Sequence, residues 1–182
     1  KKVEVNSAEA QEEGQICFQN IKYVNGDNRT LISENKGGQI ILKRAGKEKV
    51  LCNVPAGTVI YVTDGQDVKP GQQIAEWDPF NILIVSKADG VVSLENIIEG
   101  VTAISKTDED SGIIRKVISD IRWDAVPKIA VGGKEHVLPI NAVLMVRDGD
   151  SVKEGSVLAR IPKEAVGTSD IAYGLTRVLQ VL

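Results

Sequence analysis

Short apolar runs separated by turn formers cover the chain from Gln15 to Ala103. The runs are rich in Val, Ile, Leu and Thr, and helical periodicity is nearly absent. Glycine readily adopts a positive φ and Asn or Asp tolerate one, so each short segment that contains glycine favours a tight turn between two strands. These segments are Asn25-Gly26, Lys36-Gly37-Gly38, Ala45-Gly46, Asp64-Gly65, Pro70-Gly71 and Asp89-Gly90. The pattern predicts a mainly β protein.

An internal repeat is the most informative feature of the sequence. Residues 54–71 align without a gap on residues 138–155, and the similarity continues through residues 73–75 against 157–159. Each copy reads as a strand, an Asp-Gly turn, an apolar valine (Val68 or Val152), a glycine turn and a second strand. This ribbon is typical of barrel-sandwich hybrid folds. The sequence therefore predicts two tandem barrel-sandwich hybrid modules built from copies of one β unit.

The two ends of the chain have a different character from the middle. Asn6 or Ser7 is a candidate cap for a short helix through Ala8–Gln11. Near the other end, Ser169 or Asp170 can cap a helix with one apolar stripe, made of Ile171, Leu175, Val178, Leu179 and Leu182. We expect short helical segments at both termini, and we expect the second one to pack against a parent protein.

The domain organisation follows from these patterns. Residues 1–13 are predicted to be a linker, residues 14–104 the first module, residues 105–165 the second module and residues 166–182 a return into a parent helix. The polar stretch Ser105–Ser111 is the predicted connection between the modules.

The charge balance limits the classes of partner. The chain has 22 basic and 25 acidic residues and a formal charge of −3, so the whole molecule has no electrostatic footprint for nucleic acid. The local basic cluster is Lys43, Arg44, Lys47 and Lys49, on one predicted hairpin. It is a candidate contact for a nucleic-acid backbone or a partner, but an ordinary charged turn is the favoured interpretation because no aromatic residues interleave.

The cysteines and the absence of long apolar runs indicate a cytoplasmic protein. Cys17 and Cys52 lie in apolar, β-like surroundings and are predicted to be structural thiols in a reducing compartment. Residues 1–14 lack the apolar segment of a signal peptide, and no run approaches the roughly 20 residues of a membrane span. We expect no membrane partner.

Candidate catalytic and ligand-binding residues are few. Gly132-Gly133-Lys134 lacks the spacing of a phosphate loop, and His136 has no Cys or His at ligand spacing. The run Asp108–Asp110 is predicted to be a solvated loop, because nothing apolar lies beside it. Trp77 and Trp123 are predicted to pack in the core or between the repeats. No catalytic, cofactor-binding or metal-binding residue is predicted.

One segment resembles biotinyl and lipoyl carrier domains. These also pair a V-x-x-G turn with a later I-x-A-x-x-D-G-x-V segment, here Ile84–Val92. In a carrier the modified lysine occupies the hairpin tip before that segment, and the matching tip, Asp78–Asn81, has no lysine, while Lys87 falls past it. A carrier, or another β-barrel binding module, is the alternative interpretation.

A fuller resemblance covers residues 14–177. The chain is similar to the insertion of two sandwich-barrel hybrid motifs found in the trigger loop of many bacterial RNA polymerase beta-prime subunits. The residues that carry the similarity are Val54–Gly57, Asp64-Gly65, Val68, Gly71, Ala75–Pro79, Gly90–Val92, Thr107–Glu109, Asp148-Gly149, Leu158–Pro162 and Gly167–Ile171. In that family a G-L-P-R-V segment then begins the second trigger-loop helix. Here the trigger-loop junction is Gly174, Leu175, Arg177 and Val178, with Thr176 in place of the proline.

The resemblance implies a non-catalytic segment of a nucleotidyltransferase that modulates trigger-loop movement, pausing, elongation and transcript cleavage in transcription. The parent enzyme would use magnesium and zinc bound outside this segment, and the segment itself would hold no cofactor. The implied partners are the beta, alpha, omega and sigma subunits, transcription factors near the channel through which nucleotides enter, and weakly bound downstream DNA. The implied location is the cytoplasm, in association with the nucleoid.

Overall fold

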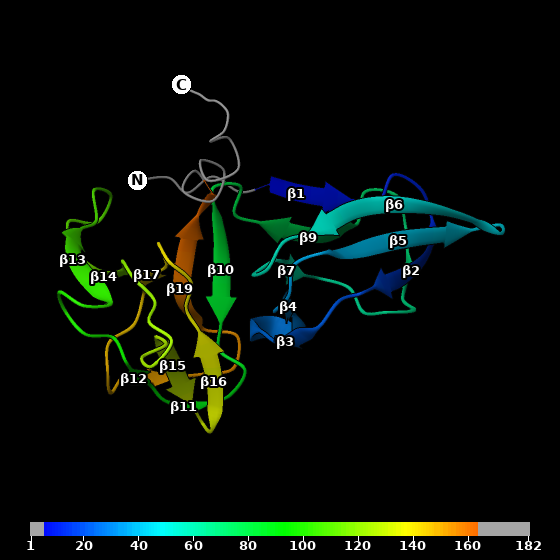
Figure 1. The fold of residues 1–182 in the computed structure, drawn as a ribbon. Coiled ribbons are helices and arrows are strands. Elements are labelled where there is room, and N and C mark those ends of the chain that lie inside the picture. Colours follow the sequence, from blue (N-terminus) through cyan, green and yellow to red (C-terminus); the bar gives the residue numbers. More distant parts are fainter. Residues whose placement is uncertain (1–5, 164–182) are drawn as a thin grey trace.

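The computed structural model describes residues 6–163 of the chain, which are almost entirely β structure (Figure 1). One group of strands comes from residues 6–77: β1 (Asn6–Glu9), β2 (Gly14–Gln19), β3 (Tyr23–Asn25), β4 (Leu31–Ser33), β5 (Gly38–Arg44), β6 (Lys47–Val54), β7 (Val59–Ile60), β8 (Asp67–Val68) and β9 (Gln73–Trp77), with a short 3-10 helix η1 (Asp27–Arg29) between β3 and β4.

The other group comes from residues 81–162. Its strands are β10 (Asn81–Val85), β11 (Gly90–Val91), β12 (Ser93–Glu95), β13 (Ala103–Thr107), β14 (Ile114–Ile118), β15 (Lys128–Val131), β16 (Lys134–Val137), β17 (Val143–Leu144), β18 (Ser151–Val152) and β19 (Val157–Pro162). The mainly β fold predicted from the sequence is confirmed.

The two groups have the same sheet topology. One sheet of the first group has the order β1-β9-β7-β4-β3, and its counterpart in the second group has the order β10-β19-β17-β14-β13. The other sheet, β6-β5-β2-β8, corresponds to β16-β15-β12 together with β11-β18, because β2 is divided into β11 and β12 in the second group. We refer to residues 6–77 as module 1 and to residues 81–162 as module 2.

The repetition extends to individual hydrogen bonds. The Gly65 N–H donates to the Ile16 carbonyl and the Gly149 N–H to the Val92 carbonyl, both at 2.8 Å. The Asp64 carboxylate accepts from the Phe18 N–H at 2.8 Å, and the Asp148 carboxylate accepts from the Leu94 N–H at 2.9 Å. One pair of β-bulges also matches, since one follows Ala8 in β1 and the other follows Ile84 in β10. The repeat predicted for residues 54–71 and 138–155 is thus part of a longer structural duplication.

Each module has its own hydrophobic core. The first is built on fully buried Ile40, Ile60 and Ile74, and the second on fully buried Ile118, Leu138 and Leu158. Cys52 belongs to the first core, and burial raises the pKa of its thiol to about 11, so the thiol stays protonated and unreactive. Trp77 packs against the same core, as predicted.

Two expectations from the sequence differ from the structure. Residues 81–104 were assigned to the first module, but their strands pair with those of module 2 and the two cores divide between β9 and β10. The short helix through Ala8–Gln11 is wrong, because Asn6–Glu9 form β1 and pair with β9. Ladder hydrogen bonds and the packing of Ala8 against the core outweigh a single helical turn.

Specific contacts join the two modules. The Leu83 N–H of β10 donates to the Ala56 carbonyl at 3.2 Å, and Leu83 fills the space where a side chain on Gly57 would lie. The Asn25 N–H donates to the Glu154 carboxylate at 2.6 Å, and a Cβ added to Gly155 would lie 2.8 Å from the Asn25 carbonyl oxygen. These close contacts involve strands and tight turns, so they fix the orientation of one module relative to the other.

The described chain begins and ends at the joint between the modules. Asn6 pairs with Trp77 at the end of β9, and the Lys163 N–H donates to the Phe80 carbonyl at 2.9 Å. The two ends of the described segment therefore lie against residues only three positions apart in the sequence.

Candidate functional site: an arginine-aspartate cleft at the module joint

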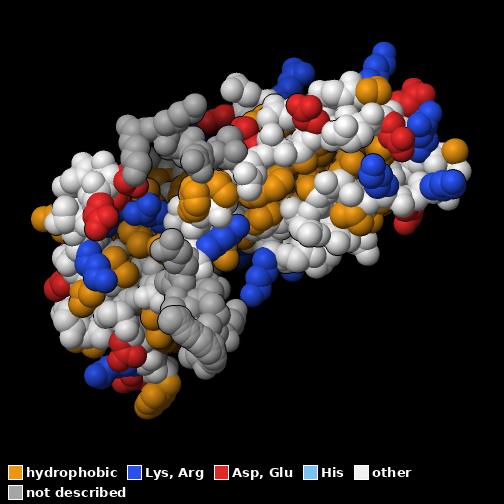
Figure 2. All heavy atoms as spheres, turned by 90° about the horizontal axis from the view of Figure 1, so that it is seen from above, with side chains coloured by type: hydrophobic (Ala, Val, Ile, Leu, Met, Phe, Trp, Pro, Cys, Tyr) orange, Lys and Arg blue, Asp and Glu red, His pale blue; other side chains and the backbone are white. Residues whose placement is uncertain are grey.

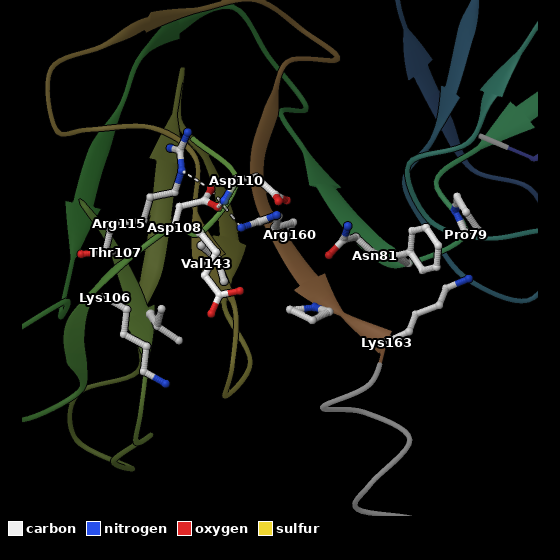
Figure 3. A pocket seen from close by; sticks show the side chains of 14 residues that line it. Pro79, Asn81, Lys106, Thr107, Asp108, Asp110, Arg115, Val143, Arg160 and Lys163 are labelled. Carbon is white, nitrogen blue, oxygen red and sulfur yellow. Dashed lines mark hydrogen bonds and ion pairs between the residues drawn. The ribbon is translucent and has the colours of Figure 1, made fainter. Parts of the chain in front are cut away.

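A cleft of about 470 Å³ opens beside the joint, on the sheet that contains β10, β19, β17, β14 and β13 (Figure 3). It is lined by Val117, Val143 and Arg160 and by residues of the loop that connects β13 to β14. Phe80 and Lys163 also line it, and Lys163 is the last residue of the described segment. The cleft is therefore next to the point where the described segment ends.

Asp108 is the centre of the charged cluster in this cleft. Its Oδ2 accepts from the Arg115 Nε at 3.4 Å and from an Arg160 Nη at 3.2 Å, while its Oδ1 accepts from the Asp110 N–H at 3.0 Å (Figure 3). The Asp108 side chain is 9% exposed, and those of Arg115 and Arg160 are 19% and 25% exposed. One carboxylate is thus shared by two partly buried guanidinium groups.

The electrostatics of Asp108 follow from this geometry. The hydrogen bond from the Asp110 N–H lowers its pKa below the usual value, partial burial opposes that shift, and the nearby Arg160 and Arg115 add to it. The sequence interpretation of Asp108 as part of a solvated loop is wrong, although Glu109 and Asp110 are exposed. Its arginine partners are seven and 52 residues away along the chain.

Arg115 and Arg160 were not singled out by sequence reasoning. The sequence did contain an indication that Arg160 has a special role. It is a charged residue within the apolar strand β19, and it stands where the repeat has the oppositely charged Glu76 in module 1. Such a residue needs a partner when it is partly buried. The cluster connects the β13–β14 hairpin to β19, the strand that leads to Lys163. It therefore stiffens module 2 close to the end of the described segment. Within residues 6–163, the Arg160 Nε is a buried donor without an acceptor.

The basic cluster lies far from this cleft, on the long hairpin formed by β5 and β6. Lys43 pairs with Glu48 at 3.5 Å, and Arg44 pairs with Glu12 at 3.3 Å and Glu13 at 3.9 Å. Figure 2 shows basic and acidic side chains interspersed at that end of module 1. Lys47 and Lys49 complete the cluster on β6. The acidic neighbours reduce its positive potential, so we assign no site to it.

His136 is a buried residue of β16 whose ring contacts β15 and the loop that follows β10. It is 4% exposed; its Nδ1 lies 2.8 Å from the Ile129 carbonyl, and its Nε2 accepts from the Lys87 N–H at 3.0 Å. These partners require a proton on Nδ1 and none on Nε2, so the folded protein holds a neutral ring. Burial lowers the pKa of His136, with the charge of Lys87 acting in the same direction and the Ile129 carbonyl and Glu34 opposing.

We expect acid to weaken the fold through His136. Because its pKa is lower in the folded state than in the unfolded chain, stabilisation is complete above about pH 6.5 and is lost as the pH falls towards the folded-state pKa. NMR of the only histidine should show a titration midpoint below 6.5, and urea unfolding should lose stability between pH 6.5 and pH 5. In His136→Gln that part of the pH dependence should disappear; an unchanged slope would contradict the assignment.

Trp123 does not pack in a core. It is 93% exposed at a turn closed by the Ala125 N–H and the Arg122 carbonyl, so the prediction of core packing is correct for Trp77 and wrong for Trp123.

Within residues 6–163, no group of three or more His, Cys, Asp or Glu side chains is placed to hold a metal ion. Among the same residues, no helix has the length and apolar character needed to span a bilayer. The predicted junction residues Gly174, Leu175, Arg177 and Val178, and the second predicted helix, lie outside the described residues.

Comparison with known proteins gives a consistent result. No family model matches the chain. Over all of its length it is 33% identical to the DNA-directed RNA polymerase subunit beta' of Thermodesulfovibrio yellowstonii and 34% identical to that of Syntrophobacter fumaroxidans. Over 98% of its length it is 36% identical to that of Koribacter versatilis. The chain spans 14%, 14% and 13% of these three relatives, respectively.

The paired β modules thus match one segment of a much larger polypeptide in each of these relatives, and the class of protein that they define is a subunit of DNA-directed RNA polymerase. Within that class, the chain belongs to the beta' subunit family, as one part of that subunit.

Proposed function

We propose that this chain is a non-catalytic insertion in the trigger loop of the RNA polymerase beta' subunit, where it modulates loop movement, pausing, elongation and transcript cleavage. The observation that carries the proposal is the full-length match to about one seventh of beta' subunits. The position within the trigger loop is supported by the resemblance of residues 14–177 to the insertion of that loop.

The geometry of the joint supports the role of an inserted body. Domains are accepted within a host chain when their ends lie close together. Asn6 and Lys163 lie against Trp77 and Phe80, so both connections to a host would leave from one place. A host segment can then fold and unfold while the modules keep their structure.

The proposed mechanism is a shift between loop states. Two modules that are rigidly joined must rotate together when the host loop refolds, because the contacts of Leu83 and Glu154 fix their relative orientation. Surface contacts that differ between the open and folded loop then change the populations of those states. The reacting groups and the metal ions would lie elsewhere in the polymerase, and the other subunits and transcription factors would be its partners.

Deletion tests the proposal. Residues 6–163 should be replaced in the beta' subunit by a short glycine linker, which the closeness of the two ends permits. We expect nucleotide addition to remain competent, while pause lifetimes and the rate of transcript cleavage change. A control polymerase should keep the insertion but carry the substitution Asp67→Asn, at an exposed position of β8 away from the cleft, and it should behave like the parent enzyme. Pause lifetimes that are unchanged by the deletion on several templates would refute the proposal.

The alternative carrier function receives no support from the described residues. The segment that corresponds to a carrier tip, Asp78–Asn81, is closed by hydrogen bonds from the Phe80 and Asn81 N–H groups to the Asp78 carboxylate. It lies at the module joint, where Phe80 also accepts from the Lys163 N–H. A tight turn in that position connects two modules and carries no lysine.

A further inference from the structure

The two hydrophobic cores differ at one end of the duplicated fold. In module 1, Val62 is 2% exposed and Leu31 is 9% exposed, and both belong to the core. The repeat places Val146 at the position of Val62, but Val146 is only partly buried against the core of module 2. The core of module 2 is therefore less completely closed at this end.

Lys116 stands at the position of Leu31. The residue that follows Leu31 pairs with Val59, and the residue that follows Lys116 pairs with Val143. Val59 and Val143 occupy the same position of the repeat. Because alternate residues of a strand share a face, Lys116 lies on the same face of β14 as Ile118, which is buried in the core. A lysine thus replaces a core leucine of module 1.

The hairpin that carries Lys116 is longer than its counterpart. β3 and β4 pair over three positions, whereas β13 and β14 pair over five, as far as Thr107 and Ile114. Ile114 shares the face of Lys116 but is 67% exposed, so the hairpin extends beyond the core. In the sheet order, β13 and β14 lie at the opposite edge from β10, the strand that contacts module 1 (Figure 1). The extension is therefore on the side of module 2 away from module 1.

A groove of about 680 Å³ is lined by this hairpin and by the turn Arg147–Asp150. Its apolar lining consists of Leu94, Ile113, Ile114, Leu144, Met145 and Val146. Leu94 is the counterpart of Phe18, because the N–H of each donates to the aspartate of an Asp-Gly turn. Phe18 packs against the core of module 1. A smaller side chain at this position, together with Lys116 in place of a leucine, leaves the groove open.

The two carboxylates of the groove already have hydrogen-bond donors. Asp148 accepts from the Leu94 N–H at 2.9 Å, and Asp150 accepts from the Arg147 N–H at 2.8 Å. Both therefore stabilise the turn through the backbone, and their negative charge is partly offset by the N–H dipoles.

Two of the three cations of the groove lack such partners. Arg115 belongs to the cluster around Asp108. Within residues 6–163, the side chains of Lys116 and Arg147 have no ion-pair partner. The repeat has Thr63 at the position of Arg147, so both cations are specific to module 2. The groove thus combines an apolar lining with two positively charged groups that are free to bind a carboxylate.

We propose that this groove binds an acidic peptide segment of another protein. The segment would place one large apolar side chain against Leu94 and Val146, where Phe18 and Leu31 fill the equivalent space of module 1. A neighbouring carboxylate would accept charge-assisted hydrogen bonds from Lys116 and Arg147. Apolar burial then supplies the affinity, and the charged contacts select acidic over basic segments. The proposal does not rest on the proposed function, because the groove belongs to module 2 itself.

Addition of the segment as an extra strand beside β13 is disfavoured. The Ser105 N–H donates to the Glu99 carboxylate at 3.1 Å, and the Ser105 hydroxyl donates to it at 2.7 Å. In module 1 the equivalent Asn25 N–H donates to the Glu154 carboxylate at 2.6 Å. A glutamate thus covers the open edge of the sheet at this position in both modules, which opposes pairing with another strand. Binding through side chains in the groove is the mode that the structure favours.

NMR titration of the chain with synthetic peptides tests the proposal. The probe is a short peptide in which a phenylalanine or a leucine is flanked by glutamates, and the matched control peptide has lysines in place of the glutamates. We expect the glutamate peptides to shift the methyl resonances of Ile114, Leu144 and Val146, and the lysine peptides to leave them unchanged. Raising the salt concentration should weaken binding several-fold, because exposed charges are screened.

Two substitutions restore the residues of module 1. Lys116→Leu should abolish the titration, because the leucine removes a cation and fills apolar space as Leu31 does. Arg147→Thr, at an exposed position, should leave the fold intact and weaken binding at least several-fold. The matched control is Lys134→Leu at the exposed start of β16, which should bind the glutamate peptides as the parent chain does.

Several results would overturn the proposal. They are the absence of shifts with the glutamate peptides, equal binding of the glutamate and lysine peptides, and shifts confined to residues outside the groove. Equal shifts with octanoate, a simple fatty-acid anion, would identify a small-molecule site instead. Undiminished binding in both Lys116→Leu and Arg147→Thr would reject the assigned residues. None of these results bears on the proposed function, which the deletion experiment tests in the polymerase.

Discussion

Gly155→Ala is expected to destabilise the protein more than Gly71→Ala, although the two glycines occupy the same position of the repeat. Both have a positive φ, 87° and 84°, so an added side chain costs about 1–2 kcal/mol of backbone strain at either site. At Gly71 the added Cβ meets nothing within 4 Å. At Gly155 it lies 2.8 Å from the Asn25 carbonyl oxygen and 3.1 Å from Ile32, so overpacking adds a further cost of about 1–3 kcal/mol.

The comparison separates strain from contact between the modules. Urea unfolding should show a total loss of about 3 kcal/mol for Gly155→Ala and about 1–2 kcal/mol for Gly71→Ala. Residual dipolar couplings should show that only Gly155→Ala changes the orientation of module 1 relative to module 2. Equal losses, or an unchanged orientation, would mean that the Asn25–Gly155 contact does not hold the modules in place.

Asp108→Asn should cost about 2 kcal/mol of folding free energy, because it leaves Arg115 and Arg160 half-buried without their anion. The exposed neighbour Glu109 supplies the control, and Glu109→Gln should change stability by no more than about 0.5 kcal/mol. Thermal and chemical unfolding of both variants checks the difference. Similar losses of folding free energy for the two variants would mean that Asp108 behaves as a solvated loop residue.

The contribution of Asp108 should also depend on pH. Its pKa is lower in the folded state, chiefly through the Asp110 N–H and the two arginines, so stabilisation is present above about pH 4 and is lost as the pH falls through the folded-state pKa. The difference in stability between the parent chain and Asp108→Asn should therefore shrink at acid pH. A constant difference down to pH 2.5 would contradict the ionic origin of the effect.

The sequence revealed the duplication only where the two copies kept the same spacing. Residues 54–71 and 138–155 align without a gap, and the structure matches them turn for turn. The first halves of the modules share little sequence, and Gly14 corresponds to Gly90 at a different spacing, because the loops before β4 and β5 have different lengths in the two copies. The strands β10–β12 were therefore assigned to the wrong side of the joint.

The remaining errors have a common physical origin. Local sequence around Asp108 is polar, but its burial comes from an arginine 52 residues away in β19. Trp123 was expected in a core because of its size, whereas the cores are filled by aliphatic side chains from the strands. Long-range pairing decides both cases, and one-dimensional patterns contain little information about it.

The closeness of Asn6 and Lys163 has a thermodynamic consequence for any longer polypeptide that carries this body. The entropy lost on closing a flexible loop rises with the logarithm of its length, by roughly 0.6 kcal/mol for each doubling. Once the modules are folded, however, their ends are held together by pairing with Trp77 and Phe80. The host then experiences only the closure cost of a short loop. A large mass can thus be carried within a moving segment while the entropy of that segment's own folding changes little.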